Sequence, residues 1–216
     1  MISRTPLPPP PPPEEIRSWP DREALLADRA AAMTVLTGRG LAIGRLLLLW
    51  LLAAVAVIGW AAVGLAIQSF EEGGLAQATG LAALVLAAVF LVPAGVGLGF
   101  WLRGGHDVRQ RLDAWAALGQ DPATDVRLRA PARCVAWLLP SVLLCLLGAW
   151  GVGHGWTAAG NGPEPVTVGD AVYALGLEAT VLLTGLLGIA RSVAHQRWSA
   201  RLLSPVPVRR GGGAHR

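Results

Sequence analysis

The chain has 216 residues, 53% of them hydrophobic, and its mean hydropathy of +0.50 is typical of an integral membrane protein. A membrane domain of this length leaves no room for a second soluble domain. The net charge is +4, every basic residue is Arg, and the bias toward Ala, Gly, Leu and Val is typical of a GC-rich bacterial genome.

The chain begins with a proline-rich tail over residues 1–17. Pro6 and the unbroken run of prolines at 8–13 exclude helix and strand and favour polyproline II. We expect a disordered spacer, and the alternative is a ligand for an aromatic-lined groove. Residues 18–45 form a juxtamembrane segment. Within it, a short amphipathic helix capped by Ser18 is expected over residues 22–35, lying along the inner leaflet.

Four apolar segments are long enough to cross a bilayer, which takes about 20 helical residues. They cover residues 46–67, 81–102, 135–156 and 171–190, so the membrane domain spans residues 46–190. Residues 103–133 form a polar connection in which Val108, Leu112 and Trp115 have helical spacing, which predicts a second interfacial helix. Residues 191–216 form a basic tail.

The arginines predict the orientation. All 18 lie before the first segment, in residues 103–133 or after the last segment. The other two connections contain no arginine, and their charged residues are all acidic. By the positive-inside rule, both termini and the middle connection are cytoplasmic. The sequence therefore predicts an all-α membrane protein: a four-transmembrane-helix bundle, N-in/C-in, with short cytoplasmic interfacial helices, in a bacterial inner membrane.

Sequence patterns for catalysis, metal binding and nucleic-acid recognition are missing. The chain has no Gly-x-Ser-x-Gly, and a Walker motif is impossible without Lys. Its four His and two Cys lack metal-ligand spacing, so we expect neither a metal nor another cofactor. Arginines beside apolar segments attract anionic lipid headgroups, which makes the bilayer a better partner than nucleic acid. We therefore do not expect an enzyme.

Small residues at four-residue spacing predict close helix packing inside a membrane. Three such sets within the segments consist only of Gly and Thr: Gly176, Thr180, Thr184 and Gly188; Gly95 and Gly99; and Gly151 and Gly155. The first set is the longest and predicts one continuous contact face along the last segment. That face packs either within the bundle or at a dimer seam.

Glu178 lies near the middle of the last segment, where an acidic residue costs about 2.5–3.5 kcal/mol on insertion scales. It must face protein or a cavity, about 200° around the helix from Gly176. Because no cation lies inside the segments, the neutral acid is favoured. It serves either as a hydrogen-bond donor to a backbone carbonyl or as a proton- or cation-binding group. Pro93 and Pro140 predict kinks in the second and third segments.

These patterns favour a non-enzymatic structural or accessory subunit of a membrane assembly, which packs with itself or with a membrane protein partner. The alternative is a small proton-coupled transporter that uses Glu178 as its coupling carboxylate. Only a few hydroxyl-bearing residues accompany Glu178 within the segments, which is little for a substrate pathway and favours the subunit.

The orientation is testable by cysteine labelling in a Cys-free background. We expect Gly162→Cys to react with an impermeant thiol reagent added outside intact cells, because residue 162 lies in an arginine-free connection. Ala123→Cys, in the arginine-rich connection, should react only after the cells are opened. Labelling of Ala123→Cys in intact cells would show that the orientation is wrong.

Overall fold

The computed structural model describes residues 7–13, 15, 19–119, 121–161 and 167–203, with only the backbone described at 122, 123, 127, 129 and 154–161. These residues form helices and no strands: α1 (Arg22–Gly40), α2 (Ile43–Glu72), α3 (Ala76–Ala116), α4 (Pro122–Asp125), the 3-10 helix η2 (Val126–Arg129), α5 (Pro131–Asn161) and α6 (Val168–Leu203). Helices α2, α3, α5 and α6 are long and apolar enough to cross a membrane, which confirms the predicted four-helix membrane fold.

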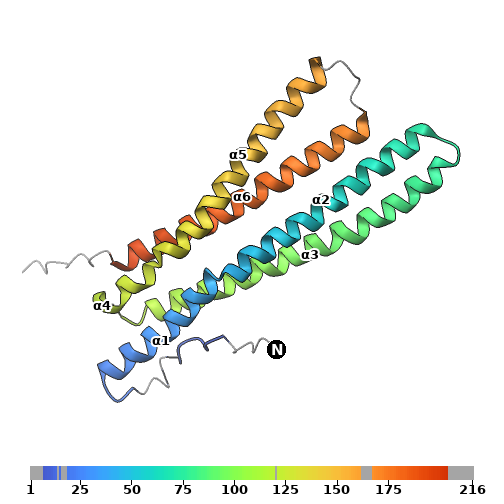
Figure 1. The fold of residues 1–216 in the computed structure, drawn as a ribbon. Coiled ribbons are helices and arrows are strands. Elements are labelled where there is room, and N and C mark those ends of the chain that lie inside the picture. Colours follow the sequence, from blue (N-terminus) through green and yellow to red (C-terminus); the bar gives the residue numbers. More distant parts are fainter. Residues whose placement is uncertain (1–6, 14, 16–18, 120, 162–166, 204–216) are drawn as a thin grey trace, which may run out of the picture.

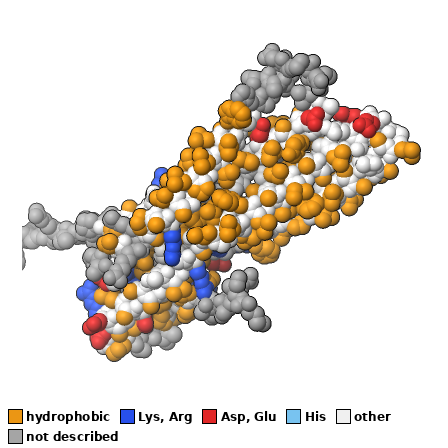
Figure 2. Space-filling model, viewed as in Figure 1, with side chains coloured by type: hydrophobic (Ala, Val, Ile, Leu, Met, Phe, Trp, Pro, Cys, Tyr) orange, Lys and Arg blue, Asp and Glu red, His pale blue; other side chains and the backbone are white. Residues whose placement is uncertain are grey.

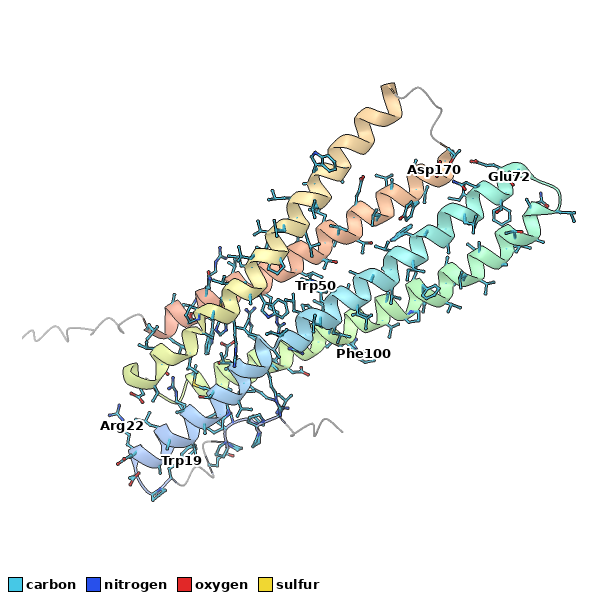
Figure 3. All side chains as sticks on the ribbon, viewed as in Figure 1. Trp19, Arg22, Trp50, Glu72, Phe100 and Asp170 are labelled. Atoms are coloured by element: carbon cyan, nitrogen blue, oxygen red, sulfur yellow. The ribbon has the colours of Figure 1, made fainter. Side chains whose placement is uncertain are left out.

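The four long helices form two hairpins that lie side by side (Figure 1). Helix α2 packs along α3, α5 packs along α6, and α2 and α6 join the two hairpins. Figure 2 shows hydrophobic side chains along the length of the two hairpins, while Arg side chains gather toward the end that carries α1. Figure 3 places Glu72 and Asp170 together at the opposite end. We call the end that carries α1 the arginine-rich end.

Glycines allow the hairpins to approach through their backbones. A Cβ atom on Gly64 of α2 would lie 2.9 Å from the carbonyl oxygen of Gly169 in α6, and one on Gly169 would lie 2.6 Å from the carbonyl oxygen of Gly64. Gly148 and Gly185 have the same role between α5 and α6, since a Cβ on either would lie less than 3 Å from backbone atoms of the other helix. Such contacts favour association where no hydrophobic driving force acts between helices.

Local capping fixes where two helices begin. Asp21, and not the expected Ser18, caps α1 by accepting a 2.7 Å hydrogen bond from the Ala24 N–H; Ser18 lies outside the described residues. Helix α6 begins after Thr167. The Thr167 Oγ1 accepts a 3.1 Å hydrogen bond from the Asp170 N–H and donates a 2.7 Å hydrogen bond to the Asp170 carboxylate. Thr167 thus caps the helix through its hydroxyl. In a capping box the carboxylate would accept from the Thr167 backbone N–H, whereas here it accepts from the Thr167 hydroxyl.

The arginine-rich end contains a folded module with its own core. We define the α1 module as α1, residues 103–116 of α3, α4, η2 and residues 191–203 of α6. Its buried core consists of Ala32, Met33, Leu36, Val108, Leu112, Trp115 and Leu128. Helix α1 extends roughly in the direction of α2 and does not cross beneath the hairpins (Figure 1).

This module changes the expected role of two amphipathic segments. Val108, Leu112 and Trp115 are helical as predicted, but they continue α3 without a break, and their apolar face packs on Met33 and Leu36 of α1. The apolar faces of α1 and of the end of α3 therefore cover each other. An interfacial helix would instead bury its apolar face in the bilayer. Sequence periodicity does not distinguish these two partners, because both offer an apolar surface.

The proline tract lies against the same module. Arg111 donates a 2.6 Å hydrogen bond to the Pro8 carbonyl, and the Trp115 indole N–H donates a 3.1 Å bond to the Pro9 carbonyl. A polyproline segment that meets an aromatic side chain in this way resembles a ligand in an aromatic-lined groove. Here the tract, Arg111 and Trp115 belong to one chain, so the carbonyls of residues 8 and 9 are bound to the α1 module.

A buried ion pair connects α1 to α4. Arg29 Nη1 lies 2.8 Å from Asp125 Oδ1 and Nη2 lies 3.2 Å from Oδ2, and both side chains are at most 1% exposed. Asp125 also accepts a 3.3 Å bond from the Asp121 N–H. Removing one partner of a fully buried pair leaves an uncompensated charge, which costs about 3–5 kcal/mol. The module is therefore held in one arrangement.

Candidate functional site

Glu178 lies in the seam between α5 and α6. A Cβ atom on Gly151 would lie 2.9 Å from Glu178 Cγ, so the carboxylate-bearing side chain packs over this glycine of α5. The side chain is half-buried, and among the described side chains none is within hydrogen-bond distance of its carboxyl group. Gly176 faces the other way, because a Cβ on it would overlap the Trp60 ring of α2. Helix α6 is thus contacted on both faces.

The small stripe of α6 does not form one contact face. It meets Trp60 of α2 at Gly176, but at Gly188 a Cβ would overlap Ser141 of α5. The reason is helix geometry: residues four apart are displaced by about 40°, so three such steps rotate the stripe by roughly 120°. Thr180 and Thr184 lie between these two contacts, and their hydroxyls donate to the carbonyls of Gly176 and Thr180 at 2.6 and 2.7 Å.

The remaining predicted packing residues divide into two groups. A Cβ on Gly95 or Gly99 would meet nothing within 4 Å, so none of the helices that the structure describes packs closely on them. Gly155 lies in the part of α5 whose side chains are not described.

Helices α3 and α5 remain helical through Pro93 and Pro140, so neither proline ends its helix.

An apolar groove of about 230 Å³ runs between α2, α3 and α6. Its lining includes Gly95, Leu98, Thr180, Thr184 and Leu187. Because both Thr hydroxyls are bonded to their own helix, the groove presents no side chain that requires a polar partner. Its chemistry therefore suits a hydrocarbon occupant.

A second recess, more polar than the groove, was not predicted. A cavity of about 280 Å³ opens at the arginine-rich end, between α3, α6 and the junction of α1 with α2. We call it the arginine cavity. Its lining includes Trp101, His106, Arg109, Arg191, His195 and Trp198.

Arg191 joins the walls of this cavity. Its guanidinium carbon lies 5.2 Å from the centre of the Trp101 ring in α3 and 5.8 Å from that of Trp137 in α5. Both distances are within the range of cation–π attraction. Its Nε donates a 3.0 Å hydrogen bond to the carbonyl of Gly40, the last residue of α1. A cation at a helix C-terminus also interacts favourably with the helix dipole.

The two indoles fix the junction between α1 and α2. The Trp101 N–H donates a 2.9 Å bond to the carbonyl of Arg45, and the Trp137 N–H donates a 3.3 Å bond to the carbonyl of Leu41. The Leu41 carbonyl lies between the two helices and needs such a partner when buried, whereas the Arg45 carbonyl belongs to the first turn of α2, so the Trp101 bond joins α3 to the start of α2. The bonds hold the junction against α3 and α5.

Two consecutive glycines give the arginines room. A Cβ on Gly104 would lie 2.7 Å from Arg45 Nη2, and one on Gly105 would overlap the Arg191 guanidinium. Glycine inside a helix costs roughly 1 kcal/mol relative to alanine. Both glycines lie inside α3, where they leave the space that the two guanidinium groups occupy.

The cavity is electropositive at neutral pH. Burial, followed by the nearby charges of Arg45 and Arg109, lowers the pKa of Arg191 to about 10, so the group stays protonated. Burial also lowers the pKa of His195, with smaller contributions from Arg109 and Arg191, while its hydrogen bond to Leu128 acts in the opposite direction. His195 is therefore neutral at pH 7, and its Nε2 donates to the Leu128 carbonyl at 3.0 Å.

Sequence reasoning missed this cavity because it assigned the arginines only to orientation and to general attraction of anionic lipid headgroups. Arg45, Arg109 and Arg191 lie far apart in the chain, and only the fold brings them together. One sequence signal was present: the pair Gly104–Gly105 stands in a helical segment, beside Trp101 at the end of an apolar run. The expected absence of a metal site stays a prediction, although no group of three metal-ligating side chains occurs among the described residues.

Comparison with known proteins adds no functional assignment. No family model matches the chain. No curated protein and no solved structure matches it either. The geometry described above is therefore the basis on which a function is argued.

Proposed function

We propose that this protein is a non-enzymatic accessory subunit of a membrane assembly, and that it holds the α1 module at the cytoplasmic face of a bacterial inner membrane. The observation that carries the proposal is the continuity between the membrane helices and the module. Helices α3 and α6 run unbroken from their apolar segments into the module, where both contribute to its core or to the residues packed on it. A module built in this way has a fixed height and angle relative to the membrane.

The packing of the module supports a structural role. Its core is closed by the buried pair of Arg29 and Asp125, and such a pair favours one arrangement over others even where it adds little net stability. The proline tract covers part of its surface through Arg111 and Trp115. The partner is a second copy of the chain or another membrane protein, and the arginines at this end favour the cytoplasmic side.

The proton-coupled transporter is the second candidate, because Glu178 is half-buried and has no hydrogen-bond donor among the described side chains. A coupling carboxylate needs further polar groups at its depth to pass protons or substrate. The nearest hydroxyls along α6, those of Tyr173, Thr180 and Thr184, do not bond to it, and both Thr hydroxyls are bonded to their own backbone. The surroundings of Glu178 therefore favour the accessory subunit.

The accessory role predicts that the α1 module is needed for assembly. Asp125→Ala leaves Arg29 buried and unpaired, which we expect to destabilise the module by about 3–5 kcal/mol. Complexes cross-linked in membranes and isolated in mild detergent should then be lost. Glu23→Gln, an exposed change at the start of α1, should leave them intact. If the wild-type chain is monomeric under the same conditions, with no cross-linked partner, it is not a subunit.

Glu178 separates the two candidates. We expect Glu178→Gln to assemble and melt like the wild type, because the amide keeps the shape of the carboxyl group. Proteoliposomes containing either form should take up protons no faster than empty liposomes. Proton uptake by the wild type that disappears in a well-folded Glu178→Gln variant would replace the accessory role with the transporter.

A further inference from the structure

The arginine cavity concentrates positive charge without matching negative charge. Arg109 is exposed at its rim, Arg191 forms part of its wall, and Arg45 lies behind that wall at Gly104. Among the described residues, no carboxylate lies within ion-pair distance of these three arginines, and Asp107 offsets only part of the charge of Arg45. The mutual repulsion of the arginines is therefore relieved by an added anion.

Arg45 also has an unused donor. Its Nη1 is buried and has no hydrogen-bond partner within the described part of the chain. A buried guanidinium N–H without an acceptor costs free energy, since it has lost its bonds to water. Arg45 does not line the cavity, so this donor adds no contact there. The charges of Arg109 and Arg191, which do line the cavity, favour a ligand with several anionic oxygens. Guanidinium groups match the geometry of phosphate particularly well.

The cavity and the apolar groove adjoin each other. Leu187 of α6 lines both, and on α3 Leu102 of the cavity is followed one turn deeper by Leu98 of the groove. From Leu187 the groove continues to Thr180, a distance of roughly 10 Å along the helix. Because Leu187 lies inside the apolar segment and Arg191 lies just beyond it, the polar cavity is at the membrane boundary and the groove is within the membrane.

We propose that the cavity and the groove together bind one anionic glycerophospholipid, with its phosphate in the arginine cavity and an acyl chain in the groove. The cavity of about 280 Å³ is at the small end of ligand sites and suits a headgroup. Trp101 lines it at the end of an apolar segment, where indoles prefer the membrane interface. This site would exist whether or not the protein is an accessory subunit.

The proposal predicts that headgroup and acyl chain are recognised separately. In detergent, binding of phosphatidylglycerol is measured by native mass spectrometry, against phosphatidylcholine with the same acyl chains. Phosphatidylglycerol should bind more tightly, and Arg109→Gln should weaken it roughly fivefold, the effect of one arginine near a membrane surface. Arg103→Gln is the matched control, because Arg103 is exposed on the same helix and does not line the cavity.

Binding of the acyl chain in the groove is tested by one substitution and a matched control on α2. Ala53→Phe fills the groove and should weaken phosphatidylglycerol binding, whereas Ala54→Phe, on the exposed side of α2, should not. Melting temperatures of all four variants establish that each is folded. Equal binding of the two lipids would show that the protein does not recognise an anionic headgroup and would contradict the proposal. Equal losses in the controls would reduce the site to general attraction of anionic lipid. If inorganic phosphate displaces the lipid and Ala53→Phe has no effect on binding, the cavity is a site for free phosphate. That result would contradict the proposal that a lipid occupies the cavity and the groove.

Discussion

The contact of Arg191 with two tryptophans is the interaction on which the arrangement of the helices depends. One guanidinium from α6 lies over indoles of α3 and α5 and bonds to the last carbonyl of α1. Cation–π contacts contribute about 0.5–2 kcal/mol each, the larger value applying where water is excluded. Trp101 and Trp137 also donate to the backbone at the junction of α1 and α2. Both hairpins and α1 are therefore linked at one half-buried cation.

The position of this cation explains features at some distance from it. Gly105 leaves room for the Arg191 guanidinium, and Gly104 does the same for Arg45, which accounts for two glycines inside a long helix. Holding three arginines near one recess costs electrostatic free energy. A phosphate offsets that cost, and a membrane supplies phosphates at this depth. The same positive charge thus favours the orientation of the protein and, in our proposal, a specific lipid.

The four-helix membrane fold was predictable, because only an uninterrupted apolar run of about 20 residues crosses the bilayer as a helix. The contacts of the amphipathic segments were not. Val108, Leu112 and Trp115 revealed a helix, but their spacing is the same whether the partner is lipid or α1. The stripe from Gly176 to Gly188 indicated close packing, yet its rotation around α6 divides it between two neighbours. Gly64, Gly148, Gly169 and Gly185, where backbones meet, lack any distinctive spacing.

The role of Arg191 is tested most directly by Arg191→Lys, which keeps the charge. Lysine lacks the planar group that lies over both indoles and the Nε that donates to Gly40. We predict that thermal unfolding in detergent will show a loss of about 1–3 kcal/mol. Arg197→Lys, at an exposed position of the same helix, should melt like the wild type. If both variants melt like the wild type, the helices do not depend on Arg191.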